Sequence, residues 1–87
     1  MSNSHKARTT VDIYGQHYVI VGTESPSHIR LVASLVDDKM REISSKNPAI
    51  DVSKLAVLTA VNAVNDYIKI KDQFERLQAE LKKKRIE

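Results

Sequence analysis

The chain has 87 residues, of which 41% are hydrophobic and 29% are charged, and it contains no cysteine. This composition is typical of one folded domain, and it excludes a disordered segment, a disulfide scaffold and thiolate metal sites. A chain this short buries only about 60–65% of its extended surface, so oligomerisation is the expected source of further stability. No apolar run reaches the ~18 residues of a membrane span, and no secretory signal is evident, so we expect a cytoplasmic protein.

The net charge of +3 comes from the C-terminus. Four of the fourteen basic residues lie at positions 82–85, and without them ten basic residues face eleven acidic ones, a net charge of −1. A nucleic-acid-binding face would spread basic residues over a surface and interleave them with aromatic residues. We therefore expect no nucleic acid as a partner, and a basic nucleic-acid-binding oligomer is the alternative interpretation.

Two segments precede the first predicted helix. Residues 1–8 are polar and lack periodicity, which predicts a disordered tail. Residues 9–22 predict a β-hairpin, because two alternating, β-branched runs flank Gly15-Gln16. Glycine at the first position of a two-residue loop favours a type II′ turn.

This turn sets the expected pairing of the strands. Val11 would pair with Ile20 and Ile13 with Tyr18, so that the four side chains share one apolar face. Two strands alone are barely stable in water, so this face must pack on helices or on a partner's sheet.

A helix is predicted over residues 26–46. Ser25 suits the N-cap position and Pro26 the first helical position, and Asn47-Pro48 favours a stop. The predicted apolar face of this helix is formed by Ile29, Val32, Val36, Met40 and Ile43, and Leu35 widens it.

A second, longer helix is predicted from residue 52 to the C-terminus, because no Gly or Pro interrupts it. Residues 52–66 would complete a head that spans residues 9–66, and residues 67–87 would form a coiled-coil tail. The head portion carries an apolar stripe, and the tail carries a heptad seam spaced 3, 4, 3 and 4 residues. The stripe consists of Val57, Val61, Val64 and Ile68, and the seam consists of Tyr67, Ile70, Phe74, Leu77 and Leu81.

These nine residues are the predicted oligomer interface. The hairpin and the first helix are too small to cover them all, and the first helix is too short to follow the seam to its end. We therefore predict an α+β fold in which a hairpin and a short helix form a small head, and the long C-terminal helix forms an oligomeric coiled coil. The alternative is a tail that folds back or stays a single solvated helix. Tyr67 and Phe74 are bulky for a two-stranded coiled coil. The number of helices in the coiled coil and their relative direction therefore stay open.

The sequence offers no constellation for catalysis. His5, His17 and His28 lie in three separate segments and have no cysteine partners. Asp37 and Asp38 are adjacent on a helix, so their carboxylates point roughly 100° apart. We expect no enzyme, no cofactor, and no catalytic, metal-binding or cofactor-binding residues.

Three segments, TVDIYGQHYVIVG, LVASLVDDKMREI and KLAVLTAVNAVNDY, resemble the ZapA family of bacterial cell-division proteins. The likeness covers roughly Thr9 to Leu81. It implies a homodimer, with an antiparallel tetramer as a further state. It also implies a cytoplasmic protein that lies at the mid-cell division ring. It also implies that the partner is FtsZ, the tubulin-like division GTPase, whose protofilaments the family bundles and stabilises.

The resemblance also implies which residues touch the filament. Charged head residues serve this contact in the family, and the matching positions here are Arg41, Lys46 and Lys54. Some relatives carry a basic residue after the hairpin glycine, where this chain has Gln16. The tail is shorter than in some members, which makes the dimer the minimum state.

Overall fold

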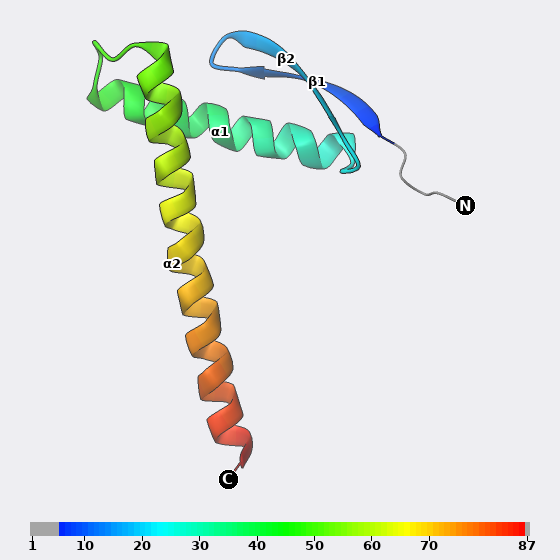
Figure 1. The fold of residues 1–87 in the computed structure, drawn as a ribbon, viewed down its shortest axis with the longest axis vertical. Helices are drawn as coiled ribbons and strands as arrows, with labels where there is room; N and C mark the ends of the chain where they lie inside the picture. The colour runs from blue at the N-terminus through cyan, green and yellow to red at the C-terminus, as the bar shows by residue number, and fades with distance from the viewer. Residues whose placement is uncertain (1–5, 87) are drawn as a thin grey trace.

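The computed structural model describes residues 6–86 as a β-hairpin followed by two helices (Figure 1). This arrangement confirms the predicted α+β class. The elements are β1 (Ala7–Ile13), β2 (Gln16–Gly22), α1 (Pro26–Lys46) and α2 (Val52–Ile86).

The first strand begins earlier than predicted. Ala7 pairs with Gly22 and Arg8 pairs with Val21, so these two residues belong to the sheet and not to a disordered tail. Residues 1–5 of the predicted tail lie outside the described residues.

The hairpin turn also differs from the prediction. The two-residue loop is Tyr14-Gly15, not Gly15-Gln16, and its φ angles are 51° and 79°. Two positive φ angles are typical of a type I′ turn, so the predicted type II′ turn was wrong.

The pairing of the strands is therefore shifted by two positions. Val11 pairs with Tyr18 rather than with Ile20, and Ile13 pairs with Gln16 rather than with Tyr18. A shift of two positions leaves each side chain on its predicted face of the sheet. The predicted apolar face is therefore correct although its partners are not.

Contacts from α1 explain why Tyr14 occupies the turn. Its backbone N–H donates to Oδ1 of Asp37 at 2.6 Å, and its hydroxyl lies 2.9 Å from Oγ of Ser44. A non-glycine residue at positive φ costs about 1–2 kcal/mol, and these two hydrogen bonds offset that cost.

The head has a small core between the hairpin and the two helices. On α1, the predicted face is correct at Met40, which is buried, and at three half-buried positions. Ala33, which lies outside the predicted face, is also buried, whereas Val32 and Leu35, which belong to it, are 42% and 58% exposed. The buried apolar side chains of the described residues are Val11, Ala33, Met40 and Leu55.

Helix α2 crosses α1 and then leaves the head (Figure 1). Asp51 caps it, because Oδ1 of this residue accepts the Lys54 N–H at 2.9 Å. An ion pair between Nζ of Lys39 and Oδ2 of Asp66, 3.4 Å apart, joins the two helices. The radius of gyration is 18.0 Å, against about 12 Å for a compact chain of this length. We call residues 67–86 of α2 the stalk.

Candidate self-association surface and partner-binding residues

The nine residues of the predicted oligomer interface lie on α2 and are all exposed in the single chain. Their exposed fractions range from 50 to 65%, which is high for large apolar side chains. The head covers none of them, as expected if another chain does so. The residues are Val57, Val61, Val64, Tyr67, Ile68, Ile70, Phe74, Leu77 and Leu81.

The total accessible surface area of the chain indicates how much surface a second copy could cover. The chain exposes 7410 Å², whereas a folded monomer of 9.8 kDa exposes about 5,200 Å². The excess of about 2,200 Å² is comparable with the area that one partner of an obligate dimer buries, about 1,000–2,500 Å². The single chain therefore carries surplus surface of the size that a stable homodimer needs.

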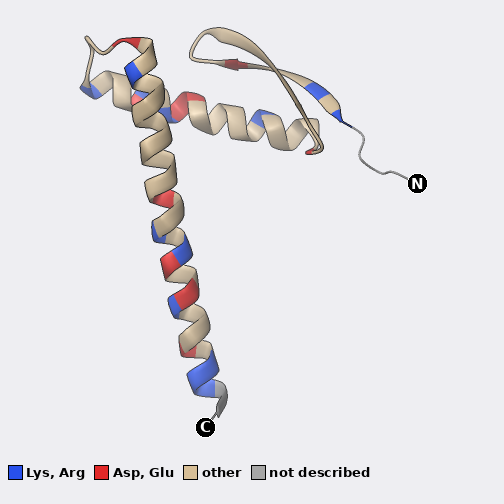
Figure 2. Ribbon diagram, viewed as in Figure 1, with Lys and Arg blue, Asp and Glu red and all other residues tan. Residues whose placement is uncertain are grey.

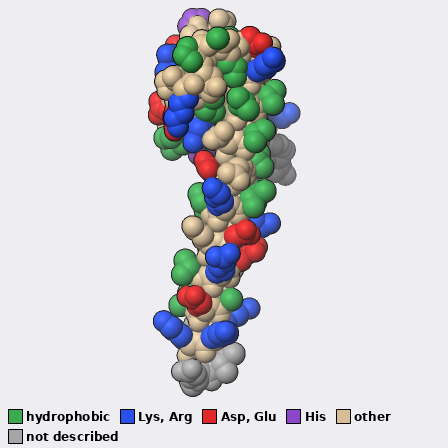
Figure 3. Space-filling view, turned by 90° about the vertical axis from the view of Figure 1, so that its left-hand side faces the viewer, with side chains coloured by type: hydrophobic (Ala, Val, Ile, Leu, Met, Phe, Trp, Pro, Cys, Tyr) green, Lys and Arg blue, Asp and Glu red, His purple; other side chains and the backbone are tan. Residues whose placement is uncertain are grey.

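Charged side chains flank this apolar surface. Residues of both signs alternate along the stalk, and lysines cluster near its end (Figure 2). A view from the side shows hydrophobic and charged side chains next to each other along the same helix (Figure 3). In the heptad set by the seam, Asp66 and Glu80 occupy g positions and Lys71 occupies an e position, beside the apolar contact.

Arg41, the first of the predicted filament contacts, is held by neighbours in the head. Its Nε donates to Oδ2 of Asp37 at 2.9 Å, and its guanidinium carbon lies 5.4 Å from the centre of the Tyr14 ring. The hydrogen bond from Arg41, and then the one from the Tyr14 N–H, lower the pKa of Asp37 below its usual value. The same carboxylate raises the pKa of Arg41. The Arg41 side chain is still 60% exposed, so a partner can reach it.

Lys46 and Lys54, the other two predicted contacts, lie where α1 ends and α2 begins. The linker between the helices, residues 47–51, keeps these two helix ends at the same corner of the head (Figure 1). The Lys46 side chain is 74% exposed and lies 4.0 Å from Glu42. Lys54 is exposed and has no ion-pair partner within residues 6–84. The structure thus groups two of the three residues and places Arg41 further back along α1.

Two residues of this region were missed by the sequence analysis. Tyr14 and Ser44 link the hairpin turn to α1 by their hydroxyl groups, 2.9 Å apart. The sequence held no clear signal for either residue. The residue before the glycine of a type I′ turn is usually Asn, Asp or Gly, whereas this chain has Tyr14. Ser44 lies thirty residues away from Tyr14 along the chain.

The described residues contain no cluster of three or more His, Asp or Glu side chains that could hold a metal ion. His17 forms a short contact with Asp12 on the hairpin, and His28 lies 4.0 Å from Glu24. Within the described residues, neither helix has an apolar stretch sufficient to cross a lipid bilayer.

Comparisons with known proteins point to one family. The family described as "Cell division protein ZapA" matches residues 9–87. A cell division protein ZapA from Geobacillus sp. (strain WCH70) is 67% identical over the full length of both chains. One from Bacillus subtilis (strain 168) is 61% identical over 97% of this chain and 99% of its own. A solved structure, a ZapA mutant dimer from Geobacillus stearothermophilus, is 57% identical, covers 94% of this chain and 95% of its own, and has a TM-score of 0.73.

Proposed function

Because this chain belongs to the ZapA family of cell division proteins, we propose that it binds FtsZ in the cytoplasm and acts there without catalysis. As a homodimer, it would cross-link and stabilise FtsZ protofilaments at the mid-cell division ring. The observation that supports this proposal is the uncovered apolar surface of α2, because cross-linking needs at least two copies of the head.

The proposed dimer forms along the stripe and the seam. Nine large side chains that are 50–65% exposed would be covered by their counterparts in a second copy. The related chain from Geobacillus stearothermophilus, which is described as a mutant dimer, has the same fold at 57% identity. Its self-association supports a homodimer of this chain.

The charges beside the seam favour a parallel stalk. In a parallel pair, a g position faces the e position of the next heptad on the other helix, which sets Asp66 opposite Lys71 of the second copy. Reversing one helix brings g positions together, so the carboxylates of Asp66 and Glu80 would face each other. A parallel dimer places both heads at the same end of the stalk.

Two heads on one stalk explain how weak contacts become effective cross-links. Once one head has bound a filament, the second head binds at an effective concentration that the dimer sets, in the millimolar range for short connections. Arg41, Lys46 and Lys54 are the residues that we propose for the filament contact. Their positive charges suit the acidic side chains of a filament, and their exposure lets them form charge-assisted hydrogen bonds.

The test is to mix the protein with FtsZ and GTP and to measure light scattering and pelleting. We expect the protein to increase both. The triple variant Arg41→Glu/Lys46→Glu/Lys54→Glu should remain dimeric but lose this effect. A triple variant with the same charge change on the stalk, Lys82→Glu/Lys83→Glu/Lys84→Glu, is the control. Unchanged filaments at saturating wild-type protein would refute the function, and equal losses in both variants would refute the assigned contact.

The antiparallel tetramer implied by the resemblance is a separate question. In a tetramer of that kind, heads would lie at both ends of the stalk and the filaments would be further apart. Sedimentation of the pure protein at increasing concentration distinguishes the two states by mass.

A further inference from the structure

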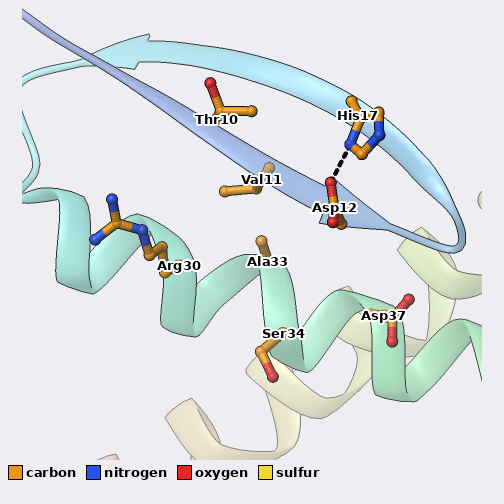
Figure 4. Close-up of a pocket in the computed structure, with 8 residues that line it drawn as sticks. All are labelled: Thr10, Val11, Asp12, His17, Arg30, Ala33, Ser34 and Asp37. Carbon is orange, nitrogen blue, oxygen red and sulfur yellow. Dashed lines mark hydrogen bonds and ion pairs between the residues drawn. The ribbon is translucent and has the colours of Figure 1, made fainter.

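A groove of about 490 Å³ lies between β1 and α1 (Figure 4). Three consecutive residues of β1, 10–12, line it, although consecutive side chains of a strand point to opposite faces. The groove therefore follows the edge of β1, and the side chain of His17 from β2 also lines it beside Asp12. From α1, Arg30, Ala33, Ser34 and Asp37 form the opposite wall.

The edge of β1 that borders this groove carries unpaired backbone groups. Only β2 pairs with β1 among the described residues. Ile13 and Gln16 flank the two-residue turn and form a hydrogen-bonded pair, and such pairs alternate along the ladder. The N–H and C=O groups of Thr10 and Asp12 therefore point away from β2. Groups of this kind are a template for a further strand.

The two ends of the groove carry opposite charges. Arg30 lies at one end and makes no ion pair with any residue between 6 and 84. Asp12 and Asp37 lie at the other end, where Asp12 contacts His17 and Asp37 binds Arg41. Arg30 and Asp37 are seven residues apart on one helix, a rise of about 10 Å. An extended chain covers that distance in about three residues.

We propose that this groove binds an extended segment of a partner protein, which pairs with the edge of β1 and presents an acidic side chain to Arg30 and a basic side chain to Asp12. Main-chain hydrogen bonds would supply affinity and the two charges would supply direction, as in other cases where a peptide adds to a sheet edge. The groove contains neither the seam nor the three proposed filament contacts, so this proposal does not depend on the proposed function.

The probe is a fluorescein-labelled peptide, Thr-Lys-Val-Thr-Val-Asp-Thr, designed to run antiparallel to β1. In this direction its lysine lies near Asp12 and its aspartate near Arg30. We expect saturable binding by fluorescence polarisation, together with NMR shifts of the Thr10 and Asp12 amides. Arg30→Glu should weaken binding at least tenfold, and replacing the peptide's aspartate by lysine should restore it. Arg76→Ala, far away on the stalk, is the control and should bind as the wild type does.

The backbone contribution has its own test. A peptide methylated on the backbone nitrogens that face β1 keeps its side chains but loses its hydrogen-bond donors, so it should bind at least tenfold more weakly. Because this test changes the peptide and not the protein, its result does not depend on whether a protein variant folds. No saturable binding of the unmodified peptide by the wild type up to about 1 mM, a free energy of about −4 kcal/mol, would overturn the proposal. Equal binding by Arg30→Glu would do the same. Slow hydrogen exchange at Thr10 and Asp12 without peptide would show that a second copy of the chain already occupies the edge, and this too would overturn it.

Discussion

Phe74→Glu should separate the proposed dimer while leaving the head folded. Phe74 is 58% exposed in the single chain and lies at the centre of the seam, beyond the ion pair that joins Asp66 to α1. A buried phenylalanine covers about 200 Å², so the dimer would bury about 115 Å² more of each copy. At about 25 cal/mol per Å², this is about 3 kcal/mol per chain and about 6 kcal/mol per dimer.

Burial of Phe74 in a two-stranded seam is incomplete, so we expect Phe74→Glu to remove about half of this dimerisation free energy. A loss of about 3 kcal/mol raises the dissociation constant about a hundredfold. A glutamate facing its counterpart adds repulsion in the same direction. Sedimentation equilibrium over a range of concentrations measures the constant, and circular dichroism reports whether the helices remain.

Two controls make this result specific. Ala79→Glu adds the same charge at an exposed f position, which faces away from the seam, and Arg76→Ala alters a charged neighbour of the seam. Neither should change the dissociation constant by more than about threefold, because exposed charges contribute less than about 1 kcal/mol. Equal effects of Phe74→Glu and Ala79→Glu would refute the seam.

Three further predictions concern the stalk direction, the head and the turn. Leu81→Cys introduces the sole thiol of the chain at a seam position, so mild oxidation should give a disulfide-linked dimer on a non-reducing gel. The control Ala79→Cys should give no such dimer. Failure of Leu81→Cys to cross-link would contradict a parallel stalk. Because Arg41 and the Tyr14 N–H lower the pKa of Asp37, its ionised form stabilises the head above the ordinary carboxyl value of about 3.9, and this stabilisation disappears as the pH falls through the lower native pKa. Asp37→Asn should flatten the fall in melting temperature over that acid range, whereas Asp38→Asn should leave it as in the wild type. Gly15→Ala should reduce the free energy of unfolding in urea by about 1 kcal/mol, because φ of this residue is 79°. No atom lies within 4 Å of the new methyl group, so the cost comes from the backbone conformation alone. An unchanged free energy would argue against the type I′ turn.

Local signals were sufficient to predict the helices. Ser25 accepts the His28 N–H at 3.2 Å as an N-cap should, and Asn47 ends α1 where the Asn-Pro pair predicted a stop. The ion pairs Asp37–Arg41 and Glu42–Lys46 have the i,i+4 spacing that brings side chains together on one helix face. These features depend on neighbours within one or two turns, which a sequence shows directly.

The turn and the core depended on residues that are distant in sequence. Which two residues form the turn was decided by Asp37 and Ser44, which bind Tyr14 from α1, and no local pattern predicts such contacts. The packing of the hairpin on α1 likewise buries Ala33, which faces β1, and leaves Val32 42% exposed. The unpaired edge of β1 could be located only once the register was known.

The separation of the head from the stalk has a consequence for how such a protein can vary. The core residues Met40 and Leu55 and the Lys39–Asp66 ion pair all lie on the head side of the seam. Whole heptads could therefore be added to or removed from the C-terminal end of α2, about 10 Å at a time, without disturbing the core or the charged corner. Each heptad would change the lifetime of the proposed dimer, so the persistence of a proposed cross-link would be set independently of the residues proposed to bind the filament.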